Sequence, residues 1–448
     1  MKSQKATRIT LFDFSTPQMR AFHMSWFAFF LCFFAWFGIA PLMAVVRDEL
    51  GLTKEQIGNT IIASVLMTVI ARVGIGWCCD RYGPRLAYTL LLVLGSIPVM
   101  CIGFAQSYES FLLFRLGIGV IGASFVITQF HTSVMFAPNI VGTANATTAG
   151  WGNVGGGVTQ LAMPLLFAAL LLVGISEFWA WRVAMVIAGI VCILTGLAYW
   201  RFTQDLPEGN YKDLRAAGKL PESAKAEGAF SEAVGDYRVW VLFLVYGACF
   251  GIELTMANIA AMYFMDYFGL GLTIAGAVAA CFGIMNLFAR TLGGYFGDLF
   301  GQRFGLKGRV RWLAVALACE GIALTAFSQM RSFVPALALM IVFGLFVKMA
   351  TGATFSIVPF VNKRALGSVS GIVGAGGNFG AVMAGFLIRS EAMTWPTALL
   401  ILGLSVTVCA GLTAFVRFSD EDEKHARQDL EVTANIDSVA AEVKGAAA

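Results

Sequence analysis

The sequence has 448 residues, of which 58% are hydrophobic and 13% are charged, and its formal net charge is +4 at pH 7. A soluble domain carries roughly 25% charged residues, so this composition excludes one, as does the mean hydropathy of +0.76. Long unbroken apolar runs also exclude a transmembrane β-barrel, because barrel strands alternate apolar and polar residues. The sequence therefore predicts an all-α integral membrane protein in a lipid bilayer.

Twelve apolar runs each reach the about 20 residues that a helix needs to cross the hydrocarbon layer. Their centres lie near Phe33, Leu66, Leu94, Gly122, Leu161, Ile190, Ala248, Phe282, Leu317, Phe343, Val373 and Leu404. A polar stretch with Pro207 and Pro221 divides them into two sets of six. We therefore expect an N-terminal arm (residues 1–20), an N-terminal six-helix half (21–202), a linker (203–237), a C-terminal six-helix half (238–418) and a tail (419–448).

The loops on one side of the predicted bundle hold most of the positive charge. Scattered cations such as Arg47 and Arg331 lie on the opposite side, whereas this side contains Arg81, Arg85, Arg303, Lys307, Arg309, Arg311, Lys363 and Arg364. Because loops rich in lysine and arginine stay in the cytoplasm, we expect both termini and the linker there. The mixed charges of the linker argue against nucleic-acid binding.

The second span contains an isolated charge, Arg72, shortly before its cytoplasmic end. An arginine within a span costs at least about 2.5–3.5 kcal/mol, so it should face the bundle interior or an aqueous cavity unless it snorkels to the surface. The segment GWCCDRYGPR follows at positions 76–85. There Asp80 can cap neighbouring helix ends and Gly83 permits a tight turn.

The segment ARTLGGYFGDLFGQR at positions 289–303 repeats this pattern in the second half. A single offset pairs Arg72 with Arg290, Gly76 with Gly294, Asp80 with Asp298, Gly83 with Gly301 and Arg85 with Arg303. A snorkelling cation has no reason to recur at the same depth in both halves. Two guanidinium groups that face each other across a pseudo-twofold axis form an anion clamp, and the rigid arginine fork suits a small planar oxyanion.

Two phenylalanines form a second symmetric pair. Phe125 ends the GASF stretch at 122–125, and Phe355 ends the GATF stretch at 352–355. One interpretation is plain packing, and the other is that the two rings hold a ligand above and below its plane. The sequence leaves both open.

The segments GWGNVGGG at 150–157 and GAGGNFGA at 374–381 lie in corresponding spans of the two halves and share an asparagine. Small residues let membrane helices approach closely, which predicts packing and gating roles for Gly150, Gly152, Gly155, Gly156, Gly376, Gly377 and Gly380. The amides of Asn153 and Asn378 need partners in a low-dielectric setting. We expect them to donate hydrogen bonds to ligand oxygens.

Two further charges lie inside apolar spans, Glu253 in the seventh and Lys348 in the tenth. Isolated charges in a membrane span are functional candidates, although these two could instead form a structural ion pair. Glu320 in the ninth span is a weaker case of the same kind. The sequence has no phosphate-binding loop, metal cluster or nucleophile with its base, so we expect neither a cofactor, nor a metal, nor an enzymatic reaction.

These motifs together resemble the nitrate/nitrite porter (NarK-type) family of the major facilitator superfamily, over nearly the whole chain. The GxxxDRxGxR pattern alone indicates only the superfamily. The stretches TPQMRAFHMSWFAFFLCFFAWFGIAPL and ATFSIVPFVNKRALGSVSGIVGAGGNFG are similar to the proton-coupled bacterial symporter branch and to plant and fungal high-affinity nitrate transporters. The resemblance implies the major facilitator fold, a monomer and a place in the bacterial inner (plasma) membrane.

The resemblance also implies an anion site near the membrane midplane. Arg72 and Arg290 would bind nitrate or nitrite, and Phe125, Phe355 and Asn153 would complete the site. Rocking of the two halves would then alternate access to it. Asp80, Arg81, Arg85, Asp298 and Arg303 would form the conformational-switch loops of this movement.

The coupling is less well defined by the sequence. Our alignment places Met256 where the nitrate/nitrite exchangers of the family have a tyrosine in the seventh span. We therefore expect proton-coupled nitrate uptake through Glu253 or Lys348. Nitrate/nitrite antiport, transport of another small anion such as formate, and nitrate sensing without transport remain alternatives.

Overall fold

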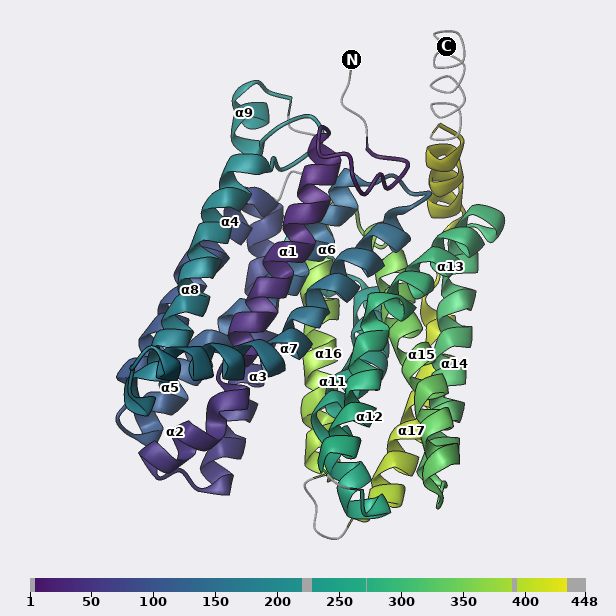
Figure 1. Cartoon of the computed structure of the whole chain (residues 1–448). Coiled ribbons are helices and arrows are strands. Elements are labelled where there is room, and N and C mark those ends of the chain that lie inside the picture. Colours follow the sequence, from purple (N-terminus) through teal and green to yellow (C-terminus); the bar gives the residue numbers. More distant parts are fainter. Residues whose placement is uncertain (1–4, 220–227, 271, 389–392, 433–448) are drawn as a thin grey trace.

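The computed structural model describes residues 5–219, 228–270, 272–388 and 393–432. Within these ranges it has twelve helical spans that are long and apolar enough to cross a membrane, which confirms the predicted number. The secondary structure of the described residues is helical apart from two isolated bridges. The spans form two bundles side by side, one from each half of the chain (Figure 1).

The N-terminal bundle contains six spans, and its fourth span is interrupted by a short 3-10 turn between α5 and α6. A short helix, α2 (Met43–Leu50), follows the first span at the end of the bundle away from α9 (Figure 1). The spans are α1 (Pro17–Phe37), α3 (Lys54–Tyr82), α4 (Pro84–Cys101), α5 (Tyr108–Gly119) with α6 (Ser124–Met135), α7 (Val141–Leu172) and α8 (Glu177–Phe202).

The C-terminal bundle repeats this arrangement, and its second span is interrupted between α12 and α13. Its spans are α11 (Tyr237–Phe268), α12 (Leu272–Ile284) with α13 (Ala289–Phe304), α14 (Leu306–Ser328), α15 (Phe333–Ile357), α16 (Leu366–Ile388) and α17 (Trp395–Leu412). Two short helices, α9 (Tyr211–Ala216) and α10 (Ala229–Gly235), lie in the segment between the bundles, and a further helical stretch covers residues 420–432.

The first span begins at Pro17 rather than at the predicted residue 21. The hydroxyl of Thr16 accepts a hydrogen bond from the backbone N–H of Met19 at 3.3 Å, which caps the helix. Pro17 occupies the first helical turn, where its missing N–H costs nothing. The cap therefore extends the helix beyond the apolar run that predicted it.

The turn between the second and third spans is made by a glycine in each half. Gly83 has a φ of 86° between α3 and α4, as its predicted turn role requires. The repeat pairs Gly83 with Gly301, but the glycine with positive φ in the second half is Gly305, at 71°. Because α13 continues to Phe304, Gly301 lies inside the helix and packs against the Arg309 side chain.

Asp80 joins the two bundles. Its carboxylate, near the end of α3, accepts hydrogen bonds from the backbone N–H groups of Gly367 and Ser368 at 2.7 Å each. It also accepts one from the Ser368 hydroxyl at 2.6 Å. These donors form the start of α16 in the opposite half, where the helix dipole favours a negative charge.

Asp298 makes the equivalent contact from the C-terminal bundle. Its carboxylate accepts hydrogen bonds from the backbone N–H groups of Gly142 at 2.9 Å and Thr143 at 2.6 Å, at the start of α7. The Thr143 hydroxyl donates a third at 2.7 Å, and the Arg309 guanidinium donates a fourth at 2.7 Å. We call the end of the molecule that contains Asp80 and Asp298 the latch end.

The three arginines of the predicted switch loops pack within their own halves. Arg85 donates to the carbonyl oxygen of Trp200 at 2.8 Å and lies over its ring. Arg81 lies over Trp77, and Arg303 lies over Phe304. Among the charged residues of these motifs, the aspartates therefore join the halves, and the motif glycines Gly76 and Gly294 pack against α16 and α7 beside them.

Candidate substrate site

Arg72 lies within α3 and is fully buried. Its Nη1 atom donates a hydrogen bond to the carbonyl oxygen of Gly374 in α16, at 2.5 Å. Its Nε and Nη2 atoms have no hydrogen-bond partner in the described part of the chain. Buried N–H groups are almost always paired, so these donors are available to an acceptor that does not belong to the protein.

Arg290 lies at the start of α13 and is also fully buried. Its Nη2 atom donates to the hydroxyl oxygen of Tyr246 in α11, at 2.8 Å. Its Nε and Nη1 atoms have no hydrogen-bond partner among the described residues. The repeat therefore predicted correctly that both arginines face the bundle interior rather than the surface.

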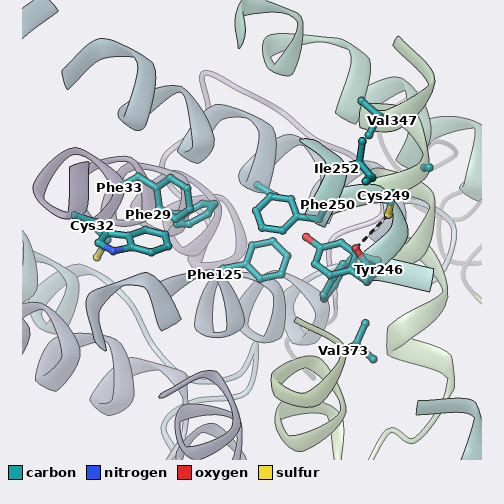
Figure 2. Packing of buried hydrophobic residues seen from close by; sticks show 14 of the residues in the cluster. Phe29, Cys32, Phe33, Phe125, Tyr246, Cys249, Phe250, Ile252, Val347 and Val373 are labelled. Carbon is teal, nitrogen blue, oxygen red and sulfur yellow. Dashed lines mark hydrogen bonds between the residues drawn. The ribbon is translucent and has the colours of Figure 1, made fainter. Parts of the chain in front are cut away.

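The two guanidinium groups lie over the same pair of aromatic rings. The Cζ atom of Arg72 is 5.0 Å from the ring centre of Phe125 and 5.6 Å from that of Phe250. The corresponding distances for Arg290 are 5.4 and 5.5 Å. The two rings are inclined by only 12° with their centres 6.2 Å apart. Figure 2 shows them next to each other. Attraction to the ring faces stabilises both charges.

The shared rings bring two like charges into one apolar region. The charges of Arg72 and Arg290 interact electrostatically with each other, and this interaction is repulsive. A small anion that accepts hydrogen bonds from both would relieve the repulsion and pair the free donors. The arrangement can therefore bind a small oxyanion.

Phe355 does not lie parallel to Phe125. The two rings meet edge to face, with an angle of 86° and a distance of 4.8 Å between their centres. They therefore do not form the two parallel faces that the sandwich interpretation requires. Phe250 and Tyr246 are the rings that lie nearly parallel to Phe125, inclined to it by 12° and 17°. Figure 2 shows the three side chains next to one another.

The two motif asparagines have side-chain amides without partners. Asn378 is fully buried in α16, and Asn153 is half-buried in α7. Neither the oxygen nor the nitrogen of either amide has a hydrogen-bond partner in the described residues. Their predicted role as donors to a ligand stays a prediction, and the free amides are compatible with it.

Glu253 and Lys348 form an ion pair, with 3.6 Å between Oε1 and Nζ. The same oxygen accepts a hydrogen bond from the Asn286 amide at 2.7 Å. The second oxygen, Oε2, lies 3.9 Å from Nη1 of Arg290. The two side chains therefore pair, and the pair is in electrostatic contact with one of the two arginines; its role in proton coupling stays a prediction.

The motif glycines of α7 and α16 pack mainly inside their own halves. A Cβ atom on Gly152 or Gly155 would overlap the Phe29 ring or the Phe30 backbone of α1, and one on Gly156 would lie 3.2 Å from the ring of Phe37. In the second half, a Cβ atom on Gly376, Gly377 or Gly380 would overlap α11, at Phe243, Phe250 and Gly247 respectively.

Gly150 differs from the other motif glycines because it faces the opposite half. A Cβ atom there would lie 2.6 Å from the carbonyl oxygen of Asn286. The predicted packing role of the glycines is therefore present in the structure. Their sliding during transport stays a prediction.

A family profile described as Major Facilitator Superfamily matches residues 25–358 and 243–440. The High affinity nitrate transporter 2.5 of Arabidopsis thaliana is 42% identical over 407 residues, which cover 91% of this chain and 81% of the relative. The Nitrate/nitrite transporter NrtP of Nostoc punctiforme is 29% identical, with 90% of this chain and 93% of the relative covered. The chain belongs to the nitrate porter family of the major facilitator superfamily. It is an integral membrane transporter and not an enzyme.

Solved structures place the porter in the same fold. The proton:xylose symporter XylE, with bound 6-bromo-6-deoxy-D-glucose, has a TM-score of 0.68 to this chain at 14% sequence identity. The match covers 90% of this chain and 96% of the symporter. At this identity the similarity concerns the fold alone.

Sequence reasoning missed three residues that contact the site of this porter: Tyr246, Phe250 and Asn286. The spacing of Tyr246, Phe250 and Glu253 places them on one face of α11, which is a signal that the sequence does contain. Met256 stands at the predicted position of the family's tyrosine, whereas the tyrosine beside Arg290 is Tyr246. Among the described residues, no group of three or more histidine, cysteine or acidic side chains is placed to hold a metal ion.

Proposed function

We propose that the porter is a secondary active transporter that carries nitrate into the cell together with protons. The observation that carries this proposal is the pair of buried guanidinium groups, Arg72 and Arg290, with free N–H donors over the rings of Phe125 and Phe250. Nitrate is a planar anion with three acceptor oxygens, which matches two planar forks. The named activity of the relatives supports this choice of anion.

Alternating access would occur around this site. The aspartate contacts hold the two halves together at the latch end, and the ribbons of the halves lie farther apart toward the opposite end (Figure 1). We propose that the latch end faces the cytoplasm, because the positive loops lie there. Rocking of the halves would release the aspartates and expose the anion to the cytoplasm.

Proton coupling is proposed to involve Glu253 and Lys348. An emptied site with two unscreened arginines is too repulsive to reorient, which suits an exchanger that always carries an anion. A symporter needs titratable groups that are coupled to the charge of the anion site. Glu253 lies 3.9 Å from Arg290 and pairs with Lys348, so this pair can connect the site to proton binding. We expect Glu253→Gln to impair nitrate-driven proton uptake, and full retention of that uptake would contradict this role.

Uptake of labelled nitrate into proteoliposomes tests the function directly. One set of vesicles has an imposed inward proton gradient, and a second set has internal nitrite without a gradient. We expect the gradient alone to drive accumulation. Uptake that requires internal nitrite would instead support nitrate/nitrite exchange. Equal competition by formate would support a broader anion carrier.

A further inference from the structure

Glu320 lies within α14 and is fully buried. Neither of its carboxyl oxygens has a hydrogen-bond partner in the described part of the chain. The other buried acidic side chains of that part each accept at least one hydrogen bond; they are Asp80, Asp205, Glu253, Asp298 and Glu423. Glu320 is therefore not stabilised in the way that the structure stabilises its other buried carboxylates.

The charged neighbours of Glu320 belong to the site cluster. It interacts electrostatically with Glu253 of α11 and Lys348 of α15. Two thiols also interact electrostatically with it, Cys249 of α11 and Cys409 of α17. Glu320 thus interacts with two members of a charged cluster in which Glu253 contacts both Arg290 and Lys348.

We propose that Glu320 is a proton-binding site whose carboxyl group takes up a proton when nitrate binds and releases it when nitrate leaves. This inference rests on the proposed function and names the residue that carries the coupled proton. The proton adds to a carboxylate oxygen from water as an O–H bond and returns to water on the other side, so no electrons are transferred. Glu253 contacts Lys348, Arg290 and Asn286 and lies between the anion site and Lys348.

Charge balance is the reason for this coupling. With Glu320 ionised, the cluster has three cations, Arg72, Arg290 and Lys348, and two carboxylates. Nitrate adds one negative charge, and protonation of Glu320 removes one. The empty site with ionised Glu320 and the loaded site with neutral Glu320 therefore have the same net charge. Because charge buried in a membrane protein is costly, equal charge lets both states reorient.

The mutual effect of nitrate binding and proton binding provides the first experiment. If nitrate favours protonation of Glu320, nitrate binding to the purified full-length protein must take up protons from solution. We expect uptake of about one proton per nitrate bound, measured with a pH-sensitive dye in weakly buffered detergent solution. We expect Glu320→Gln to abolish this uptake and Glu320→Asp, which keeps a carboxyl group, to retain part of it.

Transport provides the second experiment. In proteoliposomes, we expect Glu320→Gln to lower proton-gradient-driven nitrate accumulation about tenfold or more, because the empty carrier can no longer lose the proton. Nitrate counterflow should fall much less, because in this assay the carrier reorients in both directions with nitrate bound. Thr325→Val on the same helix is the packing control, because its hydroxyl also lacks a partner and carries no charge. It should behave like the wild type in both assays.

The outcomes separate this inference from the proposed function. Proton uptake and gradient-driven accumulation that persist in Glu320→Gln would overturn the role of Glu320 and leave symport intact. Wild-type protein that binds nitrate without proton uptake would overturn the inference even if the variant did not fold. Wild-type protein without nitrate counterflow would overturn the proposed function, and this inference with it.

Discussion

Arg72 and Arg290 each combine a positive charge with N–H donors that have no partner among the described residues. Each guanidinium group is held by one hydrogen bond, to the Gly374 carbonyl for Arg72 and to the Tyr246 hydroxyl for Arg290. Each guanidinium group can therefore donate hydrogen bonds to an anion while it keeps its hydrogen bond to the protein. A lysine would keep the charge but replace the fork with one flexible ammonium group.

We expect Arg72→Lys and Arg290→Lys each to weaken nitrate binding about tenfold or more, because a hydrogen bond to a charged group contributes about 1.5–3 kcal/mol. Isothermal titration of the purified variants with nitrate measures the change. Arg47→Lys is the matched control, since Arg47 is exposed and pairs with Asp48 at the protein surface. A wild-type affinity in either site variant would contradict the two-arginine site.

The sequence predicted the two arginines because a charge at the same depth in both halves is unusual. It could not identify Phe250 in the same way, because the chain has 38 phenylalanines and most of them are packing residues. The mutual orientation of Phe125 and Phe355 was also beyond the sequence. Ring orientation depends on neighbours from several helices, and these contacts are brought together only by the fold.

At the scale of the helices, the two glycine motifs let α7 lie close to α1 and let α16 lie close to α11. The surface of α7 is not uniform in this respect. Gly155 lies against the backbone of Phe30, whereas a Cβ atom on Gly157 would meet no atom within 4 Å. The two positions are only two residues apart and therefore point in different directions.

We expect Gly155→Leu to destabilise the protein by about 1–3 kcal/mol, because a side chain there must push α1 and α7 apart. A lowered thermal unfolding temperature in detergent, together with reduced nitrate transport, would report the effect. Gly157→Leu introduces the same side chain into open space and should unfold near the wild-type temperature. Equal behaviour of the two variants would contradict the close-packing role of Gly155.

The two latch aspartates are not equivalent, although they are paired by the repeat. Asp80 accepts three hydrogen bonds, all from the start of α16. Asp298 accepts three from the start of α7 and forms an additional ion pair with Arg309 at 2.7 Å. Arg309 also donates to the Pro138 carbonyl at 2.6 Å and so connects the same carboxylate to the segment before α7.

We expect Asp298→Asn to loosen the latch end more than Asp80→Asn, because it removes a buried ion pair as well as a carboxylate at a helix start. Hydrogen exchange of peptides covering residues 138–148 and 362–372 measures each latch separately. Exchange should rise about tenfold or more at the start of α7 in Asp298→Asn, since each lost charged hydrogen bond contributes about 1.5–3 kcal/mol. Unchanged exchange there would show that the contact does not hold the halves together.

Apolar periodicity and length predicted the twelve spans but not the breaks within them. The fourth span changes to a 3-10 turn at Val120–Ala123, and the eighth does so at Met285–Leu287, directly before Arg290. In the fourth span, the Thr68 hydroxyl donates to the Gly119 carbonyl at 2.6 Å. Such a break depends on a hydrogen-bond donor from another helix. The hydropathy of the interrupted span alone therefore does not predict where the break lies.

At the scale of the whole molecule, the latch end is also held by the N-terminal arm. The backbone N–H of Ala6 donates to the Met135 carbonyl at 2.9 Å, and its carbonyl accepts from the N–H of Ala137 at 2.9 Å. The neighbouring Asn139 carbonyl accepts a hydrogen bond from Gln302 of the other half at 2.7 Å. The segment before α7 therefore connects the arm and both halves.

We expect Ala6→Pro to release the arm, because proline lacks the N–H that donates to Met135. Loss of one backbone hydrogen bond of about 0.5–1.5 kcal/mol should raise the undocked population about two- to tenfold. The rate of trypsin cleavage after the exposed Arg8 is proportional to the undocked population when docking is fast relative to cleavage. Mass spectrometry measures this rate. Ala6→Gly keeps the N–H and should be cleaved at nearly the wild-type rate. If Ala6→Pro is cleaved no faster than Ala6→Gly, the backbone hydrogen bonds of Ala6 do not fix the arm. The arm would then contribute nothing to the connection between the halves, which would depend on Asp80 and Asp298.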